Sequence, residues 1–177
     1  MKVLLTEEEI RKGIDKLAQE LNGIYGDSPI TVVAIITGSI VMLSDLIRRL
    51  EMPLRISLIQ ASSYRGGTTS GELTIRDEMM LDIRDRHVLL LDDIFDTGQT
   101  LLKVSTRLQT MAPRSMRTAV FLSKTGSGKV QMRPDHTVFE IPNEFVVGYG
   151  LDFADYYRNL PFVGILEEHD LANRVAH

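Results

Sequence analysis

The sequence predicts an α/β domain with a mostly parallel sheet and a ligand site beyond the carboxyl ends of its strands. Short apolar runs rich in β-branched residues alternate with segments of helical periodicity along the chain. Polar turns follow directly after several of these runs, as in parallel α/β sheets that bind ligands there. We expect one domain over residues 1–177, because this length with 44% hydrophobic residues supports a single core.

The expected elements follow in chain order. Thr6 and Glu9 form a capping box before an amphipathic helix that is expected to end near Asn22 and Gly23. After it we expect a strand at 31–36, a helix at 41–50, a strand at 54–59, a mobile polar loop at 61–71, strands at 72–75 and 87–91, a helix after the turn 97–100 that Pro113 ends, and strands at 118–122, 138–141, 145–147 and 163–166.

Composition narrows the class of protein. The formal net charge of −4 gives no broad attraction to nucleic acid, and no nucleic-acid partner is expected. The chain has no cysteine, which fits a reducing compartment. No apolar run is long enough to span a membrane, and the acidic residues Glu7–Glu9 come too early for a signal peptide. We therefore expect a cytoplasmic protein without a membrane partner.

The segment 88–100 is the most informative part of the sequence. An apolar run ends in the adjacent carboxylates Asp92 and Asp93, Asp96 follows, and the polar turn Thr97–Thr100 leads into a helix. Free backbone N–H groups and the positive end of the helix dipole make such a turn an anion site. Carboxylates beside a phosphate require a divalent cation or ribose hydroxyls between them. The pattern predicts a site for a sugar phosphate that carries a metal, although an unrelated acidic cluster remains an alternative.

A second strand end, at Ile36–Ser39, has the same shape. Its turn favours an anion at the helix start, with Thr37 and Gly38 as the candidate residues. On geometry alone, an ordinary strand–helix turn with Ser39 as the cap is the more common arrangement.

The segment 88–100 resembles the phosphoribosyl-pyrophosphate (PRPP) motif of the type I phosphoribosyltransferases. The segment 140–161 resembles the purine-binding hood of hypoxanthine–guanine phosphoribosyltransferases. The resemblance covers about residues 30–166. It implies the type I phosphoribosyltransferase fold: a mostly parallel central sheet flanked by helices, with a small hood contributed mainly by about residues 124–177.

The resemblance also implies roles for individual residues. Asp96 is expected to be the general base at N7 of a purine, and Lys124 to donate to the O6 atom of the base. An aromatic side chain at Phe145 stacks on the base in that family, and backbone groups around Val146 read its edge. The PRPP contacts are expected from Asp92, Asp93, Thr97, Gly98, Gln99, Thr100, Thr37, Gly38 and Arg158, and the metal contacts from Asp152, Asp92 and Asp93.

Two further features come from the same resemblance. The loop with Ser63 and Tyr64 resembles the family's flexible loop, which closes over the active site. A long hairpin connection is equally compatible with its composition. Thr37 stands where the family often has a lysine, so a side-chain charge is missing there while backbone donors remain.

The resemblance implies a purine salvage enzyme that requires Mg²⁺. Its expected partners are PRPP and hypoxanthine or guanine as substrates, with IMP or GMP and pyrophosphate as products, and a homodimer or homotetramer is expected. A xanthine-preferring enzyme is a close alternative. A phosphoribosyltransferase-fold regulator that senses nucleotides and binds nucleic acid is an alternative from another class.

Overall fold

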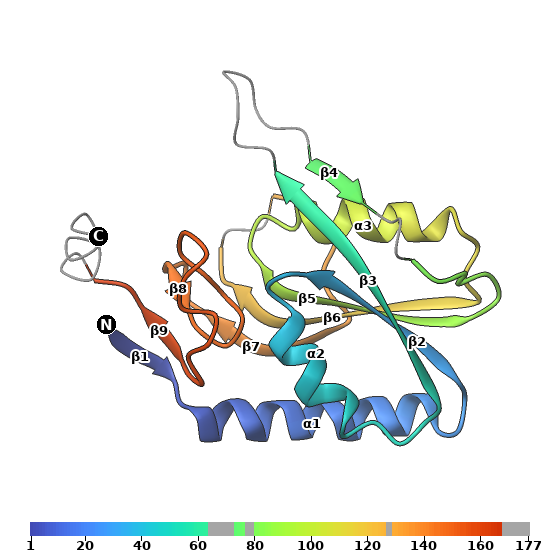
Figure 1. Ribbon diagram of the computed structural model, residues 1–177, viewed down its shortest axis with the longest axis horizontal. Helices are drawn as coiled ribbons and strands as arrows, with labels where there is room; N and C mark the ends of the chain where they lie inside the picture. The colour runs from blue at the N-terminus through green and yellow to red at the C-terminus, as the bar shows by residue number, and fades with distance from the viewer. Residues whose placement is uncertain (64–72, 77–79, 127–128, 168–177) are drawn as a thin grey trace.

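The computed structural model describes residues 1–63, 73–76, 80–126 and 129–167. Its centre is a six-stranded sheet in the order β4-β3-β2-β5-β6-β7 (Figure 1). All neighbours are parallel except β4, which runs antiparallel to β3. The bounds are β2 Ile30–Ile36, β3 Leu54–Ser63, β4 Leu73–Arg76, β5 His87–Phe95, β6 Ser115–Lys124 and β7 His136–Ile141. The predicted α/β class and mostly parallel sheet are confirmed.

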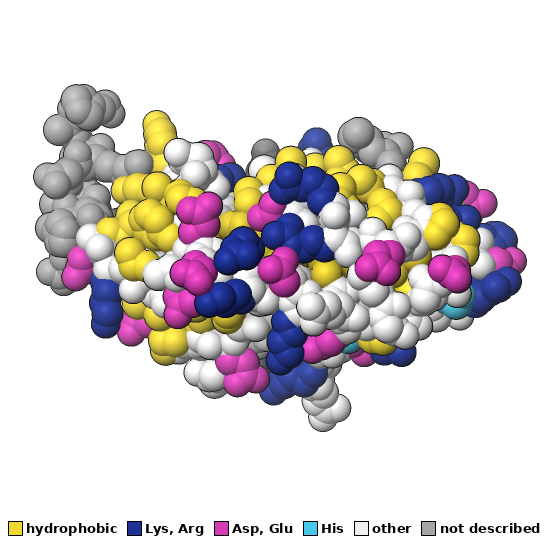
Figure 2. Space-filling view, turned by 90° about the horizontal axis from the view of Figure 1, so that it is seen from below, with side chains coloured by type: hydrophobic (Ala, Val, Ile, Leu, Met, Phe, Trp, Pro, Cys, Tyr) yellow, Lys and Arg dark blue, Asp and Glu magenta, His cyan; other side chains and the backbone are white. Residues whose placement is uncertain are grey.

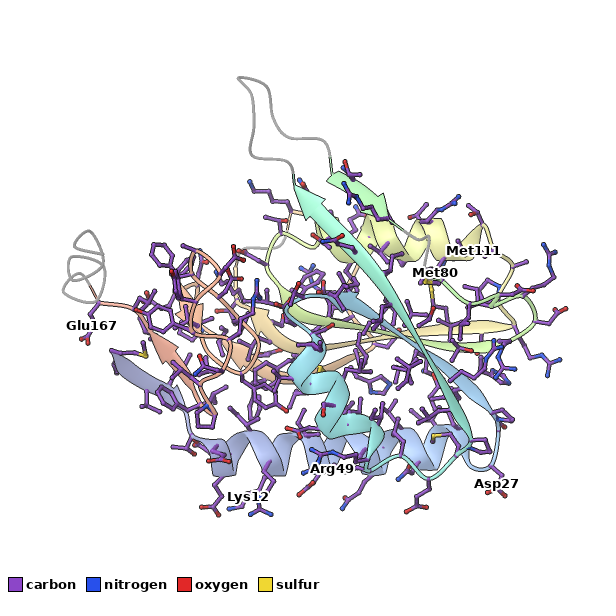
Figure 3. The ribbon with its side chains drawn as sticks, in the orientation of Figure 1. Lys12, Asp27, Arg49, Met80, Met111 and Glu167 are labelled. Carbon is purple, nitrogen blue, oxygen red and sulfur yellow. The ribbon has the colours of Figure 1, made fainter. Side chains whose placement is uncertain are left out.

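Helices cover both faces of this sheet. Helices α1 (Glu7–Tyr25) and α2 (Ile40–Ile47) lie on one face, and α3 (Gln99–Gln109) lies on the other (Figure 1). Each face has its own hydrophobic cluster, one including Ile14 and Leu46 and the other including Val104 and Leu108. Met80 and Met111 lie on the α3 side (Figure 3). The strands β2 and β5 are buried on both faces, which explains their nearly continuous apolar sequences.

A second, three-stranded sheet stands beside the first. It has the order β1-β9-β8, with β1 at Lys2–Leu5, β8 at Val146–Val147 and β9 at Val163–Ile165, and all its pairs are antiparallel. Strand β1 was not predicted from the sequence, because four residues carry too little periodicity and their pairing depends on β9, near the other end of the chain. Strand β7 falls within the range 124–177 that was predicted for the hood, but it belongs to the central sheet. The boundary of the hood near residue 124 stays a prediction.

Several element bounds differ from those expected. Helix α1 continues to Tyr25, because the Asn22 side chain does not end it but instead donates to Arg49 O and accepts from Glu51 N. Helix α2 ends at Ile47, short of residue 50. Of the expected loop at 61–71, residues 61–63 belong to β3, which pairs there with β4, and the rest lies outside the described residues.

The outer surface on the α1 side of the molecule carries charged side chains of both signs (Figure 2). Lysine and arginine side chains alternate with aspartate and glutamate side chains over this face, with no extended patch of one sign (Figure 2). Among the described residues, no helix is both long and apolar enough to cross a membrane.

Two glycines of α1 give a matched test of its packing. A Cβ atom on Gly13 would lie 2.5 Å from Cζ of Phe139, whereas one on Gly23 would meet nothing within 4 Å. Gly23→Ala should raise the free energy of unfolding by about 0.5–1 kcal/mol through helix propensity. Gly13→Ala should lower it by about 1–3 kcal/mol, because Phe139 must move. Urea unfolding of both variants measures this, and equal stabilisation would show that α1 does not pack closely on β7.

Candidate active site

The end of β5 places two carboxylates side by side. The Asp93 backbone N–H donates to Asp92 Oδ1 at 3.0 Å, and the Ile94 N–H donates to Asp93 Oδ1 at 2.9 Å. Both aspartates still belong to the strand, and the Asp92 side chain is buried, with only 4% of its surface exposed. The backbone therefore fixes the two carboxylates at the edge of the sheet.

Burial dominates the electrostatics of this pair. It raises the pKa of the Asp92 carboxyl well above its usual range, and the neighbouring charge of Asp93 raises it further. Burial also raises the pKa of Asp93, while the positive charge of Arg158 acts in the opposite direction. Two carboxylates in a poorly solvated position favour a cation or hydroxyl donors from a ligand.

The turn after β2 contacts this pair directly. A Cβ atom on Gly38 would lie 1.6 Å from Asp93 Oδ2, so a side chain has no room there. Ser39 does not cap α2 with its side chain, because its hydroxyl donates to Ile35 O at 2.5 Å. The peptide between Ile36 and Thr37 is cis, and Thr37 itself is exposed. The ordinary cap expected as the alternative is therefore absent.

The turn between β5 and α3 has the form expected of an anion site. Gly98 has a φ angle of 79°, and a Cβ atom there would lie 2.5 Å from Val130 Cγ2 and 2.7 Å from the Phe95 ring. Only glycine fits such a position. The carbonyl of Thr97 accepts from Lys129 N, and the Thr97 hydroxyl accepts from Gln99 N at 3.4 Å. The remaining N–H groups of the first turn of α3 have no intrahelical acceptor.

One cavity brings the base-side candidates together. It has a volume of about 210 Å³, and its lining includes Asp93, Asp96, Lys124, Phe145, Val146 and Asp152. All six were predicted as site residues, from four separate segments of the chain. Asp92 does not line this cavity.

Inside this cavity the charged groups already have partners. Lys124 Nζ donates to Asp96 Oδ2 at 3.3 Å, and the Lys124 side chain is only 11% exposed. Lys124 is the last residue of β6, which fixes its backbone. Phe145 is 53% exposed and packs edge to face on Phe153 at 5.7 Å, which is unlike a core residue.

Arg158 and Asp152 form an ion pair across the hood. Arg158 Nη2 lies 2.7 Å from Asp152 Oδ1, and Arg158 Nη1 donates to the carbonyl of Gly150 at 2.7 Å. Gly150 lies against the turn after β2, since a Cβ atom there would be 2.1 Å from Gly38 O. The hood is thereby in contact with the Gly38 turn.

A buried tyrosine that the sequence analysis missed anchors this part of the hood. The Tyr149 hydroxyl donates to Asp45 Oδ2 of α2 at 2.8 Å. A further ion pair joins Arg49, which follows α2, to Asp15 of α1, so the guanidinium of Arg49 lies between the two helices (Figure 3). Nothing in the sequence pattern marks Tyr149 or Asp45, because their contact joins segments 104 residues apart.

The carboxylates suit a hard divalent cation. Among the described residues, no group of three or more His, Cys, Asp or Glu side chains is arranged to hold a metal ion. Mg²⁺ commonly binds through one or two carboxylates and completes its shell with water and substrate phosphate oxygens. The Asp92–Asp93 pair or Asp152 could supply the one or two carboxylates of that mode. Of the predicted flexible-loop residues, Ser63 lies at the end of β3, and Tyr64 lies outside the described residues.

Fold and site together fit the class of α/β domains that bind phosphorylated ligands at the carboxyl edge of a parallel sheet. The chain matches the phosphoribosyl transferase domain family over residues 2–154. It is 40% identical over 174 residues to a hypoxanthine-guanine phosphoribosyltransferase of Streptococcus pneumoniae, covering 97% of this chain and 96% of the relative.

Solved structures give the same result. A hypoxanthine phosphoribosyltransferase from Staphylococcus aureus matches with a TM-score of 0.89 and 38% identity, over 96% of this chain and 92% of that one. A variant of the Trypanosoma cruzi enzyme, complexed with the product IMP, matches with a TM-score of 0.90 and 35% identity, over 99% and 95% of the two chains. The chain belongs to the phosphoribosyltransferase domain family.

The raised pKa of Asp92 predicts a pH-dependent stability. Its folded pKa lies above the unfolded value of about 4, so ionisation disfavours the fold, and stability falls as pH rises through the folded pKa. Asp92→Asn should therefore have a higher Tm than the wild type at neutral and alkaline pH, with the difference vanishing near pH 4. Thermal unfolding across pH measures this, with Asp27→Asn in an exposed turn as the control. A lower Tm at alkaline pH would contradict the burial cost.

Proposed function

We propose that this protein is a purine salvage enzyme that transfers the 5-phosphoribosyl group of PRPP to hypoxanthine or guanine. The observation that carries the proposal is the cavity in which Asp93, Asp96, Lys124 and Phe145 meet, next to the turn between β5 and α3. The curated S. pneumoniae relative is a hypoxanthine-guanine phosphoribosyltransferase, and the T. cruzi relative is complexed with IMP.

Substrate contacts divide among the segments already described. Thr97, Gly98, Gln99 and Thr100 hold the 5′-phosphate through first-turn N–H groups and hydroxyls. Asp92 and Asp93 face the ribose hydroxyls, with Asp93 nearer the cavity. Backbone groups of Thr37 and Gly38 hold the pyrophosphate. Arg158 reaches it by turning from its pair with Asp152.

The reaction forms a bond from N9 of the purine to C1 of the ribose and breaks the bond from C1 to pyrophosphate. Asp96 accepts the proton that leaves N7. Lys124 exchanges its contact with Asp96 for O6 of the base, which removes the lysine from the carboxylate that takes this proton. Phe145 stacks on the base, and its exposed ring is available at the edge of the cavity.

Mg²⁺ would be held by one or two of the carboxylates Asp92, Asp93 and Asp152 together with substrate oxygens, and when bound it would lower the charge cost of pyrophosphate departure. We also propose a homodimer or homotetramer, testable by light scattering, and a cytoplasmic location, where both substrates are expected. Closure of the loop that contains Tyr64 stays a prediction.

A steady-state assay tests the proposed function directly. Purified protein with PRPP and Mg²⁺ should convert hypoxanthine and guanine to IMP and GMP and release pyrophosphate, with adenine a poor substrate. The same assay with xanthine tests the alternative of a xanthine-preferring enzyme, which would show a higher kcat/KM for xanthine than for hypoxanthine or guanine. Absence of nucleotide formation from every base would refute the proposal.

Asp96→Asn should lower kcat about 10²- to 10⁴-fold while leaving PRPP affinity unchanged, because the amide keeps the shape and loses the basicity. Turnover and PRPP binding by calorimetry measure the two effects. Asp96→Glu is the matched control, since it keeps the carboxylate and should retain more activity than the amide. A kcat within a few-fold of wild type for Asp96→Asn would exclude Asp96 as the base.

Lys124→Met should lower kcat/KM for hypoxanthine about tenfold or more, because O6 of the base loses a charged donor. Any trace activity with adenine should survive, since its amino group gains nothing from an ammonium. Lys103→Met, at an exposed position of α3, is the control and should leave both values unchanged. An equal fall in kcat/KM for hypoxanthine and adenine would show that Lys124 does not distinguish between the two bases.

A further inference from the structure

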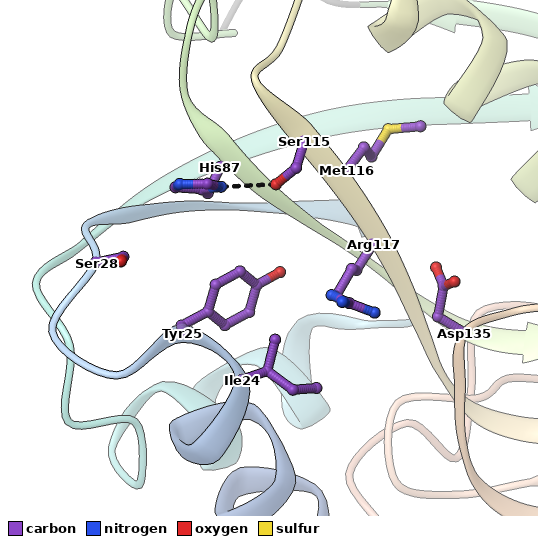
Figure 4. Close-up of a pocket in the computed structure, with 8 residues that line it drawn as sticks. All are labelled: Ile24, Tyr25, Ser28, His87, Ser115, Met116, Arg117 and Asp135. Carbon is purple, nitrogen blue, oxygen red and sulfur yellow. Dashed lines mark hydrogen bonds between the residues drawn. The ribbon is translucent and has the colours of Figure 1, made fainter.

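A second pocket lies at the amino-terminal edge of the central sheet, opposite the strand ends that carry the candidate active site. Its volume is about 390 Å³. It is formed where α1 ends and where β5 and β6 begin, and its polar lining residues are Tyr25, Ser28, His87, Ser115, Arg117 and Asp135 (Figure 4). None of these residues has a role in the proposed reaction.

The unusual feature of this pocket is the hydroxyl of Tyr25. The side chain is only 7% exposed, and its oxygen is buried without a hydrogen-bond partner among the described residues. It points towards Arg117 (Figure 4). Burial raises the pKa of Tyr25 to about 12, so at neutral pH the group is a hydroxyl with a proton to donate. A buried hydroxyl without a partner is costly, and buried polar groups in folded proteins generally have one.

The neighbours of Tyr25 define a recognisable polar pattern. Arg117 is exposed, and its guanidinium makes no hydrogen bond or ion pair within the described part of the chain. Asp135 accepts from Thr118 N and Thr118 Oγ1 with Oδ2, which leaves Oδ1 to face other groups. Arg117 lies between the Tyr25 hydroxyl and Asp135 (Figure 4). Along its polar edge the pocket thus presents two donors, the Tyr25 hydroxyl and the Arg117 guanidinium, and then one acceptor, Asp135 Oδ1.

The apolar lining complements this polar edge. Ile24 and Met116 line the pocket, and the Tyr25 ring packs edge to face on His87 at 6.4 Å. His87 is itself oriented by a 2.7 Å hydrogen bond between its Nδ1 and Ser115 Oγ. A flat molecule suits such walls. A simple carboxylate suits them less, because it would lie beside the carboxylate of Asp135.

We propose that this pocket binds a small planar molecule with an amide or lactam edge. Its carbonyl oxygen accepts from the Tyr25 hydroxyl and from Arg117, and its N–H donates to Asp135 Oδ1. Arg117 moves to admit the ligand, since it is exposed and unpaired within the described residues. A pocket of this volume lies within the range of small-molecule sites.

Benzamide is the probe for a first test, with benzoate as its anionic counterpart. Titration followed by backbone amide chemical shifts, with IMP saturating the active site, should give saturable shifts at Gly26, Ser115 and Arg117. For a molecule of this size a Kd on the order of 1 mM is expected. Benzoate should bind at least fivefold more weakly. Tighter binding of benzoate would overturn the ligand class, and no saturable shift at these residues with either probe would overturn the site.

Variants give the second test. Tyr25→Phe removes only the hydroxyl, so it should weaken benzamide about three- to tenfold, while the Tm of the free protein stays level or rises. A fall in Tm would show that the hydroxyl is satisfied in the free protein and would overturn its role. Arg117→Ala should weaken benzamide, and Arg114→Ala, exposed and outside the pocket, should not. Nucleotide formation should be unchanged in Tyr25→Phe, so this result is separable from the proposed function.

Discussion

The burial of two adjacent carboxylates at the end of β5 is the constraint on which the rest of the site depends. Asp92 and Asp93 are held by backbone N–H groups while burial raises the pKa of both. Gly38 has no side chain because Asp93 occupies that space, and Gly98 has none because Phe95 and Val130 occupy it. The free protein therefore keeps a poorly solvated pair of carboxyl groups, whose ionisation burial disfavours, beside two turns that favour anions. Such an arrangement is stabilised by a ligand that brings both hydroxyls and a cation.

The hood depends on a different interaction. Tyr149 ties it to Asp45 of α2, and Gly150 brings it against the carbonyl of Gly38. Arg158 then pairs with Asp152, and its charge opposes the rise that burial causes in the pKa of Asp93. Because α2 begins directly after the Gly38 turn, the same short helix positions both the turn and the hood. Contacts between the hood and the Gly38 turn thus run through one element.

The sequence predicted what local pattern encodes. The run ending in Asp92 and Asp93, the glycine at 98 and the capping box at Thr6 each act within a few residues, and the structure has all three. It did not predict β1, because that strand exists only through its pairing with β9. It missed Tyr149 for the same reason, since a tyrosine in a hood segment has no sign of its distant aspartate. Side-chain partners such as Asp96 for Lys124 also need the folded chain.

The most direct measurement of the central claim is the number of protons released when PRPP and Mg²⁺ bind. Calorimetric titrations in buffers of different ionisation enthalpy give this number. Burial raises the pKa of Asp92 and Asp93 in the free protein. We therefore expect the wild type to release protons on binding, and the number released should grow as the pH is lowered towards the raised pKa values of these carboxyls in the unliganded protein. The release should be smaller in Asp92→Asn, which subtracts the contribution of the ligand itself. Equal release from the two proteins at every pH would contradict the account.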